Sequence, residues 1–382
     1  MSTQLEDEFD VIVVGCGVWG SATMWSLAKR GYRVLGLDQH TPPHQHGSHG
    51  GATRLARMSN STGKQYTRLT RATLDLWRAL GNETGQEIFR ETGTMFIGEV
   101  GSRWFDNTLA NLVESDFEYE VMEPATAMAR VPGLHVHPSE SVVWEPTGGV
   151  ILVEPAINSL HQVIRKLETR LEFEQAVTGW SDAGDSIEVT STKGRFSTKK
   201  LVMTTGAFSH ATTGLDLPMT IERQVLFNYP VPQDMSALPS LYFSAPPGVD
   251  AAPAYGCPEP DGSYKLSVAN SGDRIEPDAM TQSVSEEDFE LVQKVVGERL
   301  PGLGSAAFAS NVCMWSEVSD GHWILGRHPH DERVVFGAGC NGRGFRFGTI
   351  VGELLSDLVE EREDDPALAF FSPGRFENLG SG

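Results

Sequence analysis

Two kinds of apolar pattern alternate along the chain, and together they predict an α/β fold. Residues 11–14 form a short β-branched run bounded by glycine, which is typical of a parallel strand buried on both faces. We expect a helix over 21–30 to follow it, and then a second strand over 32–37. Similar apolar runs predict further strands at 148–153, 201–210 and 334–339.

Apolar residues at helical spacing predict several amphipathic helices between these strands. Leu69, Leu76, Trp77 and Leu80 fall on one face of a helix over 66–80. Other helices are expected at 104–114, 123–131, 155–170, 285–299 and 349–360. A strand is expected at 88–98, and short antiparallel strands are expected at 171–176, 186–191 and 195–198.

From 221 to 269 the pattern changes to aromatic residues that alternate with polar ones, interrupted by many prolines. This pattern predicts an antiparallel sheet in a second lobe. We therefore expect a discontinuous Rossmann-type nucleotide-binding domain, made of residues 1–87, 145–220 and 321–382. A substrate domain with a mixed or antiparallel sheet would comprise residues 88–144 and 221–320.

Gly15, Gly17 and Gly20 give the G-x-G-x-x-G spacing directly after the first predicted strand. In such a motif the first glycine permits a tight turn, the second lets the backbone approach a pyrophosphate, and the third lets the helix pack closely. Asp38 ends the second strand, where its carboxylate can accept hydrogen bonds from a ribose diol. The order of these features favours a dinucleotide site over a glycine-rich turn without a ligand. The motif alone does not separate NAD from FAD.

The composition of the 382-residue chain narrows the classes of ligand and location. Its formal net charge of −21 argues against nucleic acid and against anionic membranes, both of which need a basic face. The sequence has no apolar run of about 18 residues, and its acidic first ten residues lack the apolar core of a secretory signal. Cys16, Cys257, Cys313 and Cys340 have no metal-type or C-x-x-C spacing, so we expect unpaired thiols in a reducing cytoplasm.

Five segments resemble those of a known family of flavoenzymes. They are FDVIVVGCGVWG, PPHQHGSHGGATRLAR, YGCPEPDGSYKL, VCMWSEVSDGHWILGRHP and GAGCNGRGFRFGTIVGELL, and they occur in the family's order between residues 9 and 358. The family is that of monomeric sarcosine oxidase and N-methyltryptophan oxidase, which are FAD-dependent amine oxidases within the D-amino-acid-oxidase group. The resemblance implies an FAD-binding domain of Rossmann type, a small-molecule amino acid as substrate, O2 as acceptor, hydrogen peroxide as product and a monomeric protein.

The resemblance gives roles to two residues that the sequence alone leaves open. Alone, Cys313 in NVCMW is a buried apolar residue. In the family, the cysteine of a V-C-M-aromatic segment forms a thioether to the flavin 8α-methyl carbon. Alone, Lys265 in SYKLS is a surface lysine with a buried stem. In the family, the matching lysine lies over the flavin and holds a water near N5, where its charge would stabilise superoxide.

A second group of candidates lies in the loop after the second predicted strand: Ser48, His49, Thr53, Arg54 and Arg57. Alone, the two arginines could be ion-paired on the surface. The resemblance places His49 and Arg54 against the flavin and Arg57 on the substrate carboxylate. A guanidinium suits that task because its planar fork matches a carboxylate bidentately.

Three positions depart from the family's pattern. Arg346 stands where a lysine that helps to bind the carboxylate is usual, and Gly50 and Ala269 stand where histidines are usual. Tyr255 remains as an expected aromatic wall of the substrate site. These departures argue against sarcosine itself and favour a bulkier amino acid.

The segment 339–347, GCNGRGFRF, precedes a predicted helix. The resemblance implies that its backbone amides and the helix dipole lie near the flavin N1–C2=O edge; the alternative is an ordinary glycine-rich turn. The expected cofactor-binding residues are Gly15, Gly17, Val18, Trp19, Gly20, Asp38, Ser48, His49, Thr53, Arg54, Val177, Cys313, Gly342, Gly344, Phe345 and Arg346.

No metal site is expected, because His322, His328 and His330 lack the i, i+4 spacing of a zinc-binding helix. The resulting hypothesis is an FAD-dependent amine oxidase that acts on a secondary or primary amino acid, with Lys265 and His49 beside the reacting atoms. No strong general base is evident in the sequence. Two alternatives are a flavin-dependent dehydrogenase that passes electrons to a carrier and a non-catalytic FAD-binding protein.

Overall fold

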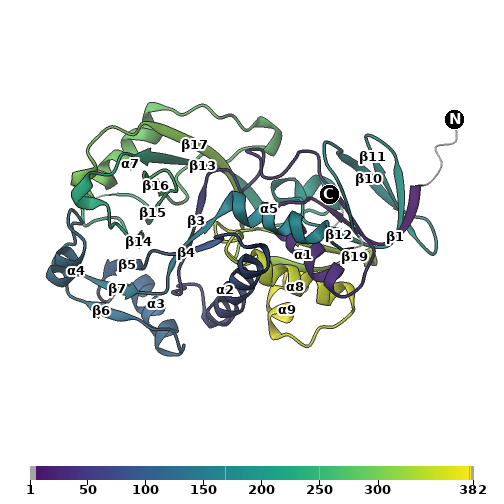
Figure 1. Ribbon diagram of the computed structural model, residues 1–382, viewed down its shortest axis with the longest axis horizontal. Helices are drawn as coiled ribbons and strands as arrows, with labels where there is room; N and C mark the ends of the chain where they lie inside the picture. The colour runs from purple at the N-terminus through teal and green to yellow at the C-terminus, as the bar shows by residue number, and fades with distance from the viewer. Residues whose placement is uncertain (1–5, 168, 249, 378, 380–382) are drawn as a thin grey trace.

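The computed structural model describes residues 6–167, 169–248, 250–377 and 379. Within them the chain forms two eight-stranded sheets and a three-stranded sheet. Figure 1 shows one large sheet around β1, β12 and β19 on the right and the other around β5, β7 and β13 to β17 on the left. The start of the N-terminal segment, for which we expected no secretory signal, lies outside the described residues.

The first sheet has a parallel centre, as the apolar runs predicted. Its strands follow the order β19-β12-β1-β2-β9, and each neighbouring pair is parallel. Their bounds are β1 (Glu6–Val14), β2 (Val34–Leu37), β9 (Thr169–Glu172), β12 (Arg195–Met203) and β19 (Asp331–Ala338). Antiparallel strands extend it: β10 (Val177–Asp182), β11 (Ile187–Ser191) and β18 (Ile324–His328).

Two sequence predictions about this sheet were wrong. The segments 195–198 and 201–210 do not form separate strands, because 195–203 is the single strand β12. Its first half pairs with β11 and its second half with β19, so one edge serves two partners. The helix predicted over 155–170 is α5 (Val153–Ile164), and Thr169–Glu172 instead forms β9, parallel to β2 rather than antiparallel. Thr169–Glu172 is a strand because it pairs with the edge of β2 that β1 leaves free. The local sequence pattern contains no information about this distant pairing.

The second sheet is mixed, and two separate parts of the chain build it. Its order is β17-β13-β16-β15-β14-β5-β7-β6, and only the β14–β5 pair among these is parallel. The bounds are β5 (Thr94–Glu99), β6 (Glu120–Met122), β7 (Glu140–Glu145), β13 (Met219–Tyr229), β14 (Ser240–Phe243), β15 (Ala254–Pro258), β16 (Tyr264–Val268) and β17 (Ala309–Val318). We predicted no strand at β17.

The small sheet consists of β3 (Thr53–Ala56), β8 (Gly149–Leu152) and β4 (Phe89–Glu91). The strand predicted over 88–98 is therefore divided, since β4 belongs to this sheet and β5 to the second large one. The break falls at Gly93, which has a φ of +71° and whose added Cβ would lie 1.8 Å from the Trp144 ring. Only glycine fits there.

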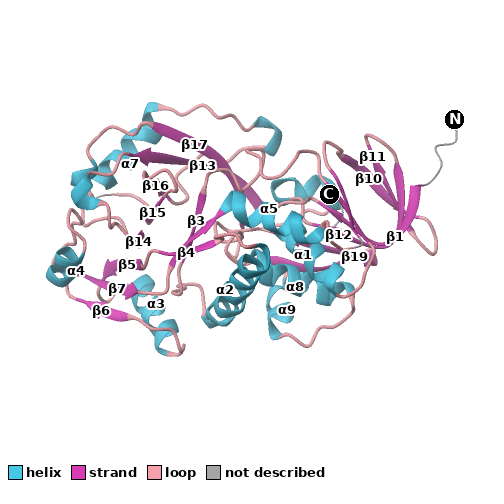
Figure 2. Ribbon diagram, viewed as in Figure 1, coloured by secondary structure: helices cyan, strands magenta, loops and turns pink. Residues whose placement is uncertain are grey.

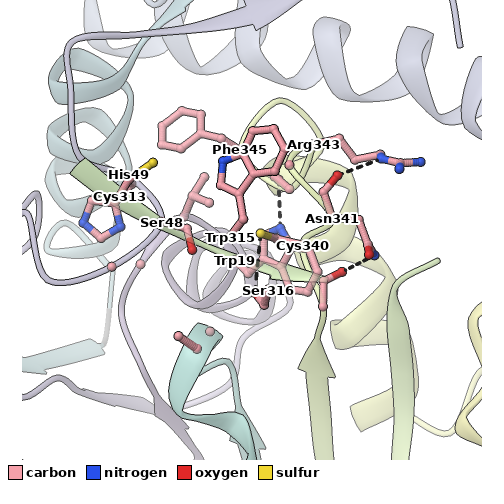
Figure 3. Close-up of a pocket in the computed structure, with 18 of the residues that line it drawn as sticks. Trp19, Ser48, His49, Cys313, Trp315, Ser316, Cys340, Asn341, Arg343 and Phe345 are labelled. Carbon is pink, nitrogen blue, oxygen red and sulfur yellow. Dashed lines mark hydrogen bonds between the residues drawn. The ribbon is translucent and has the colours of Figure 1, made fainter. Parts of the chain in front are cut away.

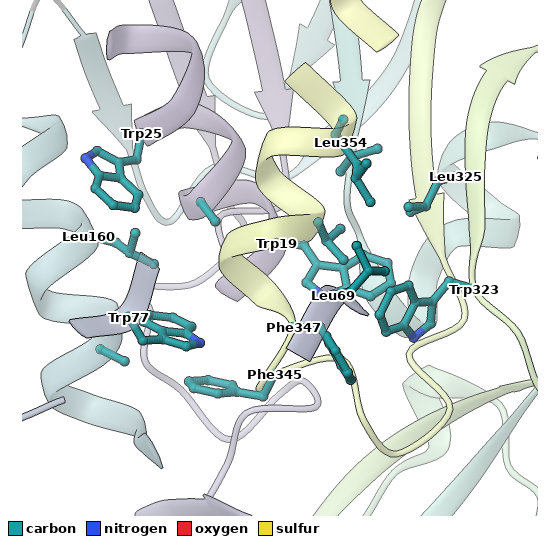
Figure 4. Close-up of a cluster of buried hydrophobic side chains, with 14 of the residues drawn as sticks. Trp19, Trp25, Leu69, Trp77, Leu160, Trp323, Leu325, Phe345, Phe347 and Leu354 are labelled. Carbon is teal, nitrogen blue, oxygen red and sulfur yellow. The ribbon is translucent and has the colours of Figure 1, made fainter. Parts of the chain in front are cut away.

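Four long helices pack together: α1 (Val18–Lys29), α2 (Lys64–Thr84), α5 and α8 (Gly348–Val359). Of these, α1 and α8 lie against the parallel sheet. The other helices are α3 (Arg103–Val113), α4 (Pro124–Arg130), α6 (Ser209–Thr213), α7 (Glu286–Arg299) and α9 (Pro366–Phe371). Helices are cyan in Figure 2. Between the long helices lies an aromatic core with Trp19, Trp77, Trp323 and Phe347 (Figure 4). In the described part of the chain, none of the helices combines the length and the apolar character needed to cross a membrane.

Candidate functional site

A cavity of about 540 Å³ opens at the carboxyl ends of the parallel strands. Val14, Leu37 and Ala338 are the last residues of β1, β2 and β19, and all three line it. Residues of the other two sheets complete the walls. In open α/β sheets, ligands bind at this end of the strands.

Nearly all of the predicted site residues meet in this one cavity; Gly20 lies outside its lining. The predicted residues that line it are Gly15, Gly17, Val18, Trp19, Asp38, Ser48, His49, Thr53, Arg54, Arg57, Val177, Tyr255, Lys265, Cys313, Gly342, Gly344, Phe345 and Arg346. Ala269 also lines it, so that departure from the family's pattern faces the same space.

The glycine motif forms the turn that its spacing predicted. Gly15 has a φ of +89°, and a Cβ there would lie 2.6 Å from the Thr204 carbonyl oxygen. A Cβ on Gly20 would lie 1.9 Å from the Gly15 oxygen, so Gly20 sets the close packing of α1 on the turn. Gly17 is the N-cap of α1, which has no side-chain cap and no acidic residue in its first turn. The positive end of this helix therefore faces the cavity uncompensated.

Asp38 closes this end of the cavity. One of its oxygens accepts the Cys16 N–H at 2.7 Å, and the other accepts the His40 N–H at 2.9 Å. Burial acts to raise the pKa of Asp38, but His44 and these two backbone donors outweigh it and lower the pKa. The side chain is thus an anion suited to accept hydrogen bonds from a ribose.

His49 is buried beside the glycine turn. Its Nε2 lies 3.2 Å from the His44 backbone N–H and accepts that hydrogen bond, so the ring proton is on Nδ1. Burial, with the charges of His44 and Arg54, lowers the pKa of His49 to about 3. Nδ1 is the atom nearest to the space beside Gly17, 3.6 Å from where a Cβ would stand. His49 is therefore a neutral N–H donor toward a ligand at the turn.

Arg54 and Arg57 are not surface ion pairs, which corrects the interpretation from sequence alone. Arg54 lines the cavity and donates to the carbonyl oxygens of Thr53, Ser48 and Gly50 at 2.8, 2.9 and 2.6 Å. Arg57 donates to the Ser59 carbonyl at 2.7 Å and lies over the Tyr242 ring at 4.1 Å. Each side chain donates these hydrogen bonds to neutral groups. The buried Glu145 carboxylate acts on Arg57 electrostatically but forms no ion pair with it, so Arg57 can still bind an anionic ligand.

Arg346 lies beside Arg57 and is only 5% exposed. It donates to the Arg57 carbonyl oxygen at 2.8 Å and to the Asn60 amide oxygen, while its buried Nε has no partner. Burial, with the charges of Arg57 and Arg343, lowers the pKa of Arg346. Among the described residues, no carboxylate forms an ion pair with Arg57, Arg343 or Arg346. The buried Glu145 carboxylate acts electrostatically on Arg57 and Arg346, and Glu317 lies near Arg343, but neither forms an ion pair with them. Guanidinium groups without an ion-pair partner in so acidic a protein indicate a site for an anion.

Lys265 is buried, and its interpretation as a surface lysine was wrong. Only 3% of it is exposed, and its Nζ donates to the Thr53 carbonyl at 2.6 Å and to the Thr53 hydroxyl at 2.8 Å. Its Nζ also lies 2.7 Å from a carboxylate oxygen of Glu259. Sequence reasoning missed Glu259, because only the turn between β15 and β16 brings it back to Lys265.

Cys313, Trp315 and Glu317 alternate along β17 and point to the cavity together. Burial raises the pKa of Cys313, while the charges of Arg54 and Lys265 oppose that change. In Figure 3, Cys313 lies on the His49 side of the group, and the Arg343 guanidinium points the other way. Cys340 also lines the cavity, and its sulfur accepts a hydrogen bond from Ser316.

Glu317 is a second functional candidate that sequence reasoning missed. Its carboxyl group makes no hydrogen bond or ion pair to any residue in the described ranges. Burial raises the pKa of Glu317 to about 7, with Arg343 opposing the change and Glu222 adding to it. The period-2 alternation of VCMWSEV would have placed Glu317 on the face of Cys313, had that segment been predicted as a strand.

The glycine-rich segment after β19 needs its glycines. Gly342 has a φ of +62°, and a Cβ there would lie 2.8 Å from the Trp315 ring. A Cβ on Gly344 would lie 2.7 Å from that of Cys340, and the Gly344 carbonyl accepts a hydrogen bond from the Trp19 indole at 2.8 Å (Figure 3). The first and last glycine segments of the chain are thereby joined across one wall of the cavity.

The residues present fit a bound FAD. A Cβ-free turn with an uncapped helix end suits a pyrophosphate, and Asp38 suits the ribose. The unpartnered Nε of Arg346 indicates that a further polar group is missing from the opposite end. The cavity runs continuously between these ends.

The histidines set aside as structural lie elsewhere. The His322 ring lies 3.2 Å from the Tyr66 hydroxyl, and His328 lies 3.0 Å from the Thr213 carbonyl oxygen. Over the ranges that the structure describes, no group of three or more His, Cys, Asp or Glu side chains is arranged to hold a metal ion.

Comparison with known proteins gives one family. The chain matches the family model described as FAD dependent oxidoreductase over residues 10–358. It is 29% identical over 382 residues to monomeric sarcosine oxidase of Bacillus sp. (strain B-0618), with 97% of both chains covered. It is 27% identical over 374 residues to N-methyl-L-tryptophan oxidase of Yersinia pestis (strain Pestoides F), with 97% of this chain and 100% of the relative covered.

Two solved structures show the same fold. NikD, described as an unusual amino acid oxidase essential for nikkomycin biosynthesis, aligns with a TM-score of 0.84 at 24% identity, over 96% of this chain and 98% of that one. L-proline dehydrogenase from P. horikoshii aligns with a TM-score of 0.86 at 20% identity, over 98% and 99% of the two chains. The expected fold class, a Rossmann-type domain with a mixed-sheet substrate domain, is confirmed.

Proposed function

Because the chain belongs to the family of FAD-dependent oxidoreductases, we propose that its cavity oxidises the carbon–nitrogen bond of an amino acid. The observation that carries this proposal is that Arg57, Arg343 and Arg346 all line the cavity and form no ion pair with a carboxylate of the described chain. An amino acid brings the missing carboxylate. The neutral, partly apolar walls formed by Tyr255 and Trp315 then receive the rest of the molecule.

The chain's own residues would bind, orient and shield the substrate. Arg57 and Arg346 would hold the carboxylate, which fixes the α-carbon relative to the cofactor. His49 would donate a hydrogen bond from its Nδ1–H to the cofactor at the glycine turn. FAD, when bound, supplies the two-electron acceptor. The substrate amine is oxidised to an imine, water then gives a carbonyl compound and an amine, and O2 takes two electrons and two protons to become hydrogen peroxide.

The substrate is proposed to be a secondary amino acid, N-methylated or cyclic, or a primary one, bulkier than sarcosine. Ala269 borders the cavity and leaves room where a longer side chain would stand. Gly50 lies outside the cavity lining, and a Cβ there would lie 3.2 Å from the Asn311 amide oxygen, so Gly50 adds no room. Arginine at position 346 keeps the positive charge but extends it over the Phe347 ring at 4.7 Å. These features support a larger substrate without identifying it.

We also propose that the cofactor is attached covalently through Cys313. Its sulfur lines the cavity on the same strand face as Trp315. The attachment would join sulfur to the flavin 8α-carbon; the hydrogens lost from the thiol and the methyl group would pass to the flavin ring and then to O2. In wild type, yellow colour should stay with acid-precipitated protein. Cys313→Ser should release it, and Cys340→Ser, the matched control, should retain it. Colour retained by Cys313→Ser would refute the linkage.

The function is tested by anaerobic titration of the holoenzyme with N-methyl, cyclic and primary amino acids. At least one should bleach the flavin absorbance, and the same amine without its carboxylate should bleach it at least about 10-fold more slowly, since charge-assisted hydrogen bonds are lost. Equal bleaching rates for the amino acid and for the amine without its carboxylate would contradict the role of the arginines. Hydrogen peroxide formed in air, measured with a peroxidase-coupled dye, tests O2 as acceptor.

A flavin-dependent dehydrogenase is the second candidate, because Glu259 neutralises Lys265. Rapid bleaching followed by slow reoxidation in air would favour it over an oxidase. A non-catalytic FAD-binding protein would show no bleaching with any amine.

Three coarser expectations stay proposals as well. A monomer is testable by light scattering. A cytoplasmic location is supported by four thiols without a disulfide. The domain division at 88–144 and 221–320 is supported by the separate sheets and is testable by limited proteolysis.

A further inference from the structure

Lys265 is held inside the protein by three contacts. Its Nζ donates hydrogen bonds to the Thr53 carbonyl at 2.6 Å and to the Thr53 hydroxyl at 2.8 Å. It also forms an ion pair with the Glu259 carboxylate, 2.7 Å away. The positive charge that would face the cavity therefore has a negative charge directly beside it.

The backbone holds Glu259 in this position. Glu259 directly follows β15, its N–H donates to the Ser263 carbonyl at 2.9 Å, and its carbonyl accepts the Gly262 N–H at 3.1 Å. This turn places the carboxylate beside Lys265 on the neighbouring strand β16. The Thr53 hydroxyl donates to the same carboxylate oxygen that contacts Lys265. The pair is therefore a built feature rather than a chance surface contact.

The pair is also shielded from solvent. Lys265 is 3% exposed and Glu259 is 8% exposed, so water screens their charges only weakly. Seen from the cavity, the positive and negative charges largely cancel. A second carboxylate does not share the contact among the described residues.

We propose that Glu259 limits the rate at which the reduced cofactor reacts with O2, by cancelling the charge of Lys265 through their buried ion pair. This inference rests on the proposed function, in which FAD fills the cavity beside Lys265. Reoxidation moves two electrons from the reduced flavin to O2, which also takes up two protons and becomes hydrogen peroxide. The first electron makes superoxide, an anion that an uncompensated lysine would stabilise. Glu259 is thus a positioning residue that tunes the choice between O2 and another acceptor.

The test reduces the holoenzyme by light, without any amine, and mixes it with O2 in a stopped-flow instrument. Glu259→Gln and Glu259→Ala should both raise the second-order rate constant of reoxidation by about 10- to 100-fold, because the charge of Lys265 is no longer cancelled. Lys265→Met should fall below wild type. Glu259→Gln/Lys265→Met should be slower than Glu259→Gln, since the fast reaction needs the positive charge of Lys265.

Two control variants separate charge from shape. Glu259→Asp keeps the carboxylate and should stay within about threefold of wild type. Asp261→Asn changes the same turn, where Asp261 contacts Ser263 and not Lys265, and should leave the rate constant unchanged. Unchanged or slower reoxidation in both charge-removing variants would overturn the proposal. So would a Glu259→Gln/Lys265→Met variant that reoxidises as fast as Glu259→Gln.

Sulfite binding gives a readout that needs no turnover. Sulfite adds to the oxidised flavin and leaves it negatively charged, so Glu259→Gln should bind sulfite at least about fivefold more tightly than wild type. Glu259→Gln/Lys265→Met should bind sulfite more weakly than Glu259→Gln, because it lacks the positive charge. Since neither experiment uses an amine, acceleration without any bleaching substrate would support this inference while refuting the proposed substrate class, and the reverse result would refute only this inference.

Discussion

The two ends of the cavity are built in different ways. At the glycine end, one continuous stretch from Gly15 to Asp38 supplies backbone N–H groups, a helix end and a carboxylate. At the arginine end, side chains come from β16, β17 and the segments around Arg57 and Arg346. The glycine end can approach a ligand closely because its turn has no Cβ atoms. The arginine end can bind an anion because its guanidinium groups form no ion pair. Damage to the first should thus be close to all-or-none, and damage to the second should be graded.

The largest effect is expected at Gly20. Gly20→Ala puts a Cβ 1.9 Å from the Gly15 oxygen, which must displace either α1 or the turn. We expect the variant to retain less than about a tenth of the wild-type flavin per polypeptide, measured by absorbance after gel filtration. Gly297→Ala, in α7 with nothing within 4 Å, is the matched control and should keep its flavin and gain up to about 1 kcal/mol of stability. A Gly20→Ala protein with its full content of flavin would contradict the expected difference between the two ends of the cavity.

Arg57→Met should have the next largest effect and leave flavin binding intact. Loss of a charge-assisted pair costs about 1.5–3 kcal/mol, so KM for the amino acid should rise by about 10- to 150-fold. Steady-state kinetics with the substrate and with its carboxylate-free analogue measure the effect. The KM for the analogue should hardly change. Arg68→Met removes an exposed arginine that pairs with Asp365 and should change neither value. An equal rise in KM for both compounds would show that Arg57 does not bind the carboxylate.

Asp38→Asn tests the glycine end more gently than Gly20→Ala. In the Cys313→Ser background, where binding is reversible on the proposed linkage, the Kd for FAD should rise by about 10- to 100-fold as charge-assisted ribose hydrogen bonds weaken. Fluorescence titration of apoprotein with FAD and with flavin mononucleotide measures it. Only FAD should lose affinity, since the mononucleotide has no adenosine. Asp10→Asn, which weakens a surface ion pair with Lys199, serves as the control.

The smallest effect is a pH dependence at Glu317. Its pKa is about 7 in the folded protein against 4.5 ordinarily, so the folded state binds this proton more tightly. Stability from this group is complete below pH 4.5 and is lost as pH rises toward 7. Relative to Glu317→Gln, the wild-type unfolding free energy should fall by roughly 1 kcal/mol over that interval, a value reduced for partial exposure. Urea denaturation at several pH values measures it, and parallel curves would contradict the assignment.

The sequence predicted the glycine end well because its structure is local. The strand, turn and helix around Gly15 lie within one short segment whose own pattern identifies them, although β12 and α8 pack against them in the fold. The second end was predicted only where the resemblance named residues, as for Lys265 and Cys313. Glu259 and Glu317 were missed because their roles come from neighbours brought together by the mixed sheet. For the same reason the residues of β9 were predicted partly as the end of a helix and partly as an antiparallel strand, since their conformation depends on parallel pairing with β2.

β3 is only four residues long, yet it carries groups that serve both ends of the cavity. Thr53 at its start anchors the ammonium of Lys265, Arg54 holds the preceding loop, and Arg57 follows its last residue. Its pairing with β8 fixes all three at once. A slip of one residue along β8 would invert every side chain of the strand and misalign both half-reactions together. Engineering of a new substrate range should therefore keep this strand fixed and vary the outer end of β17.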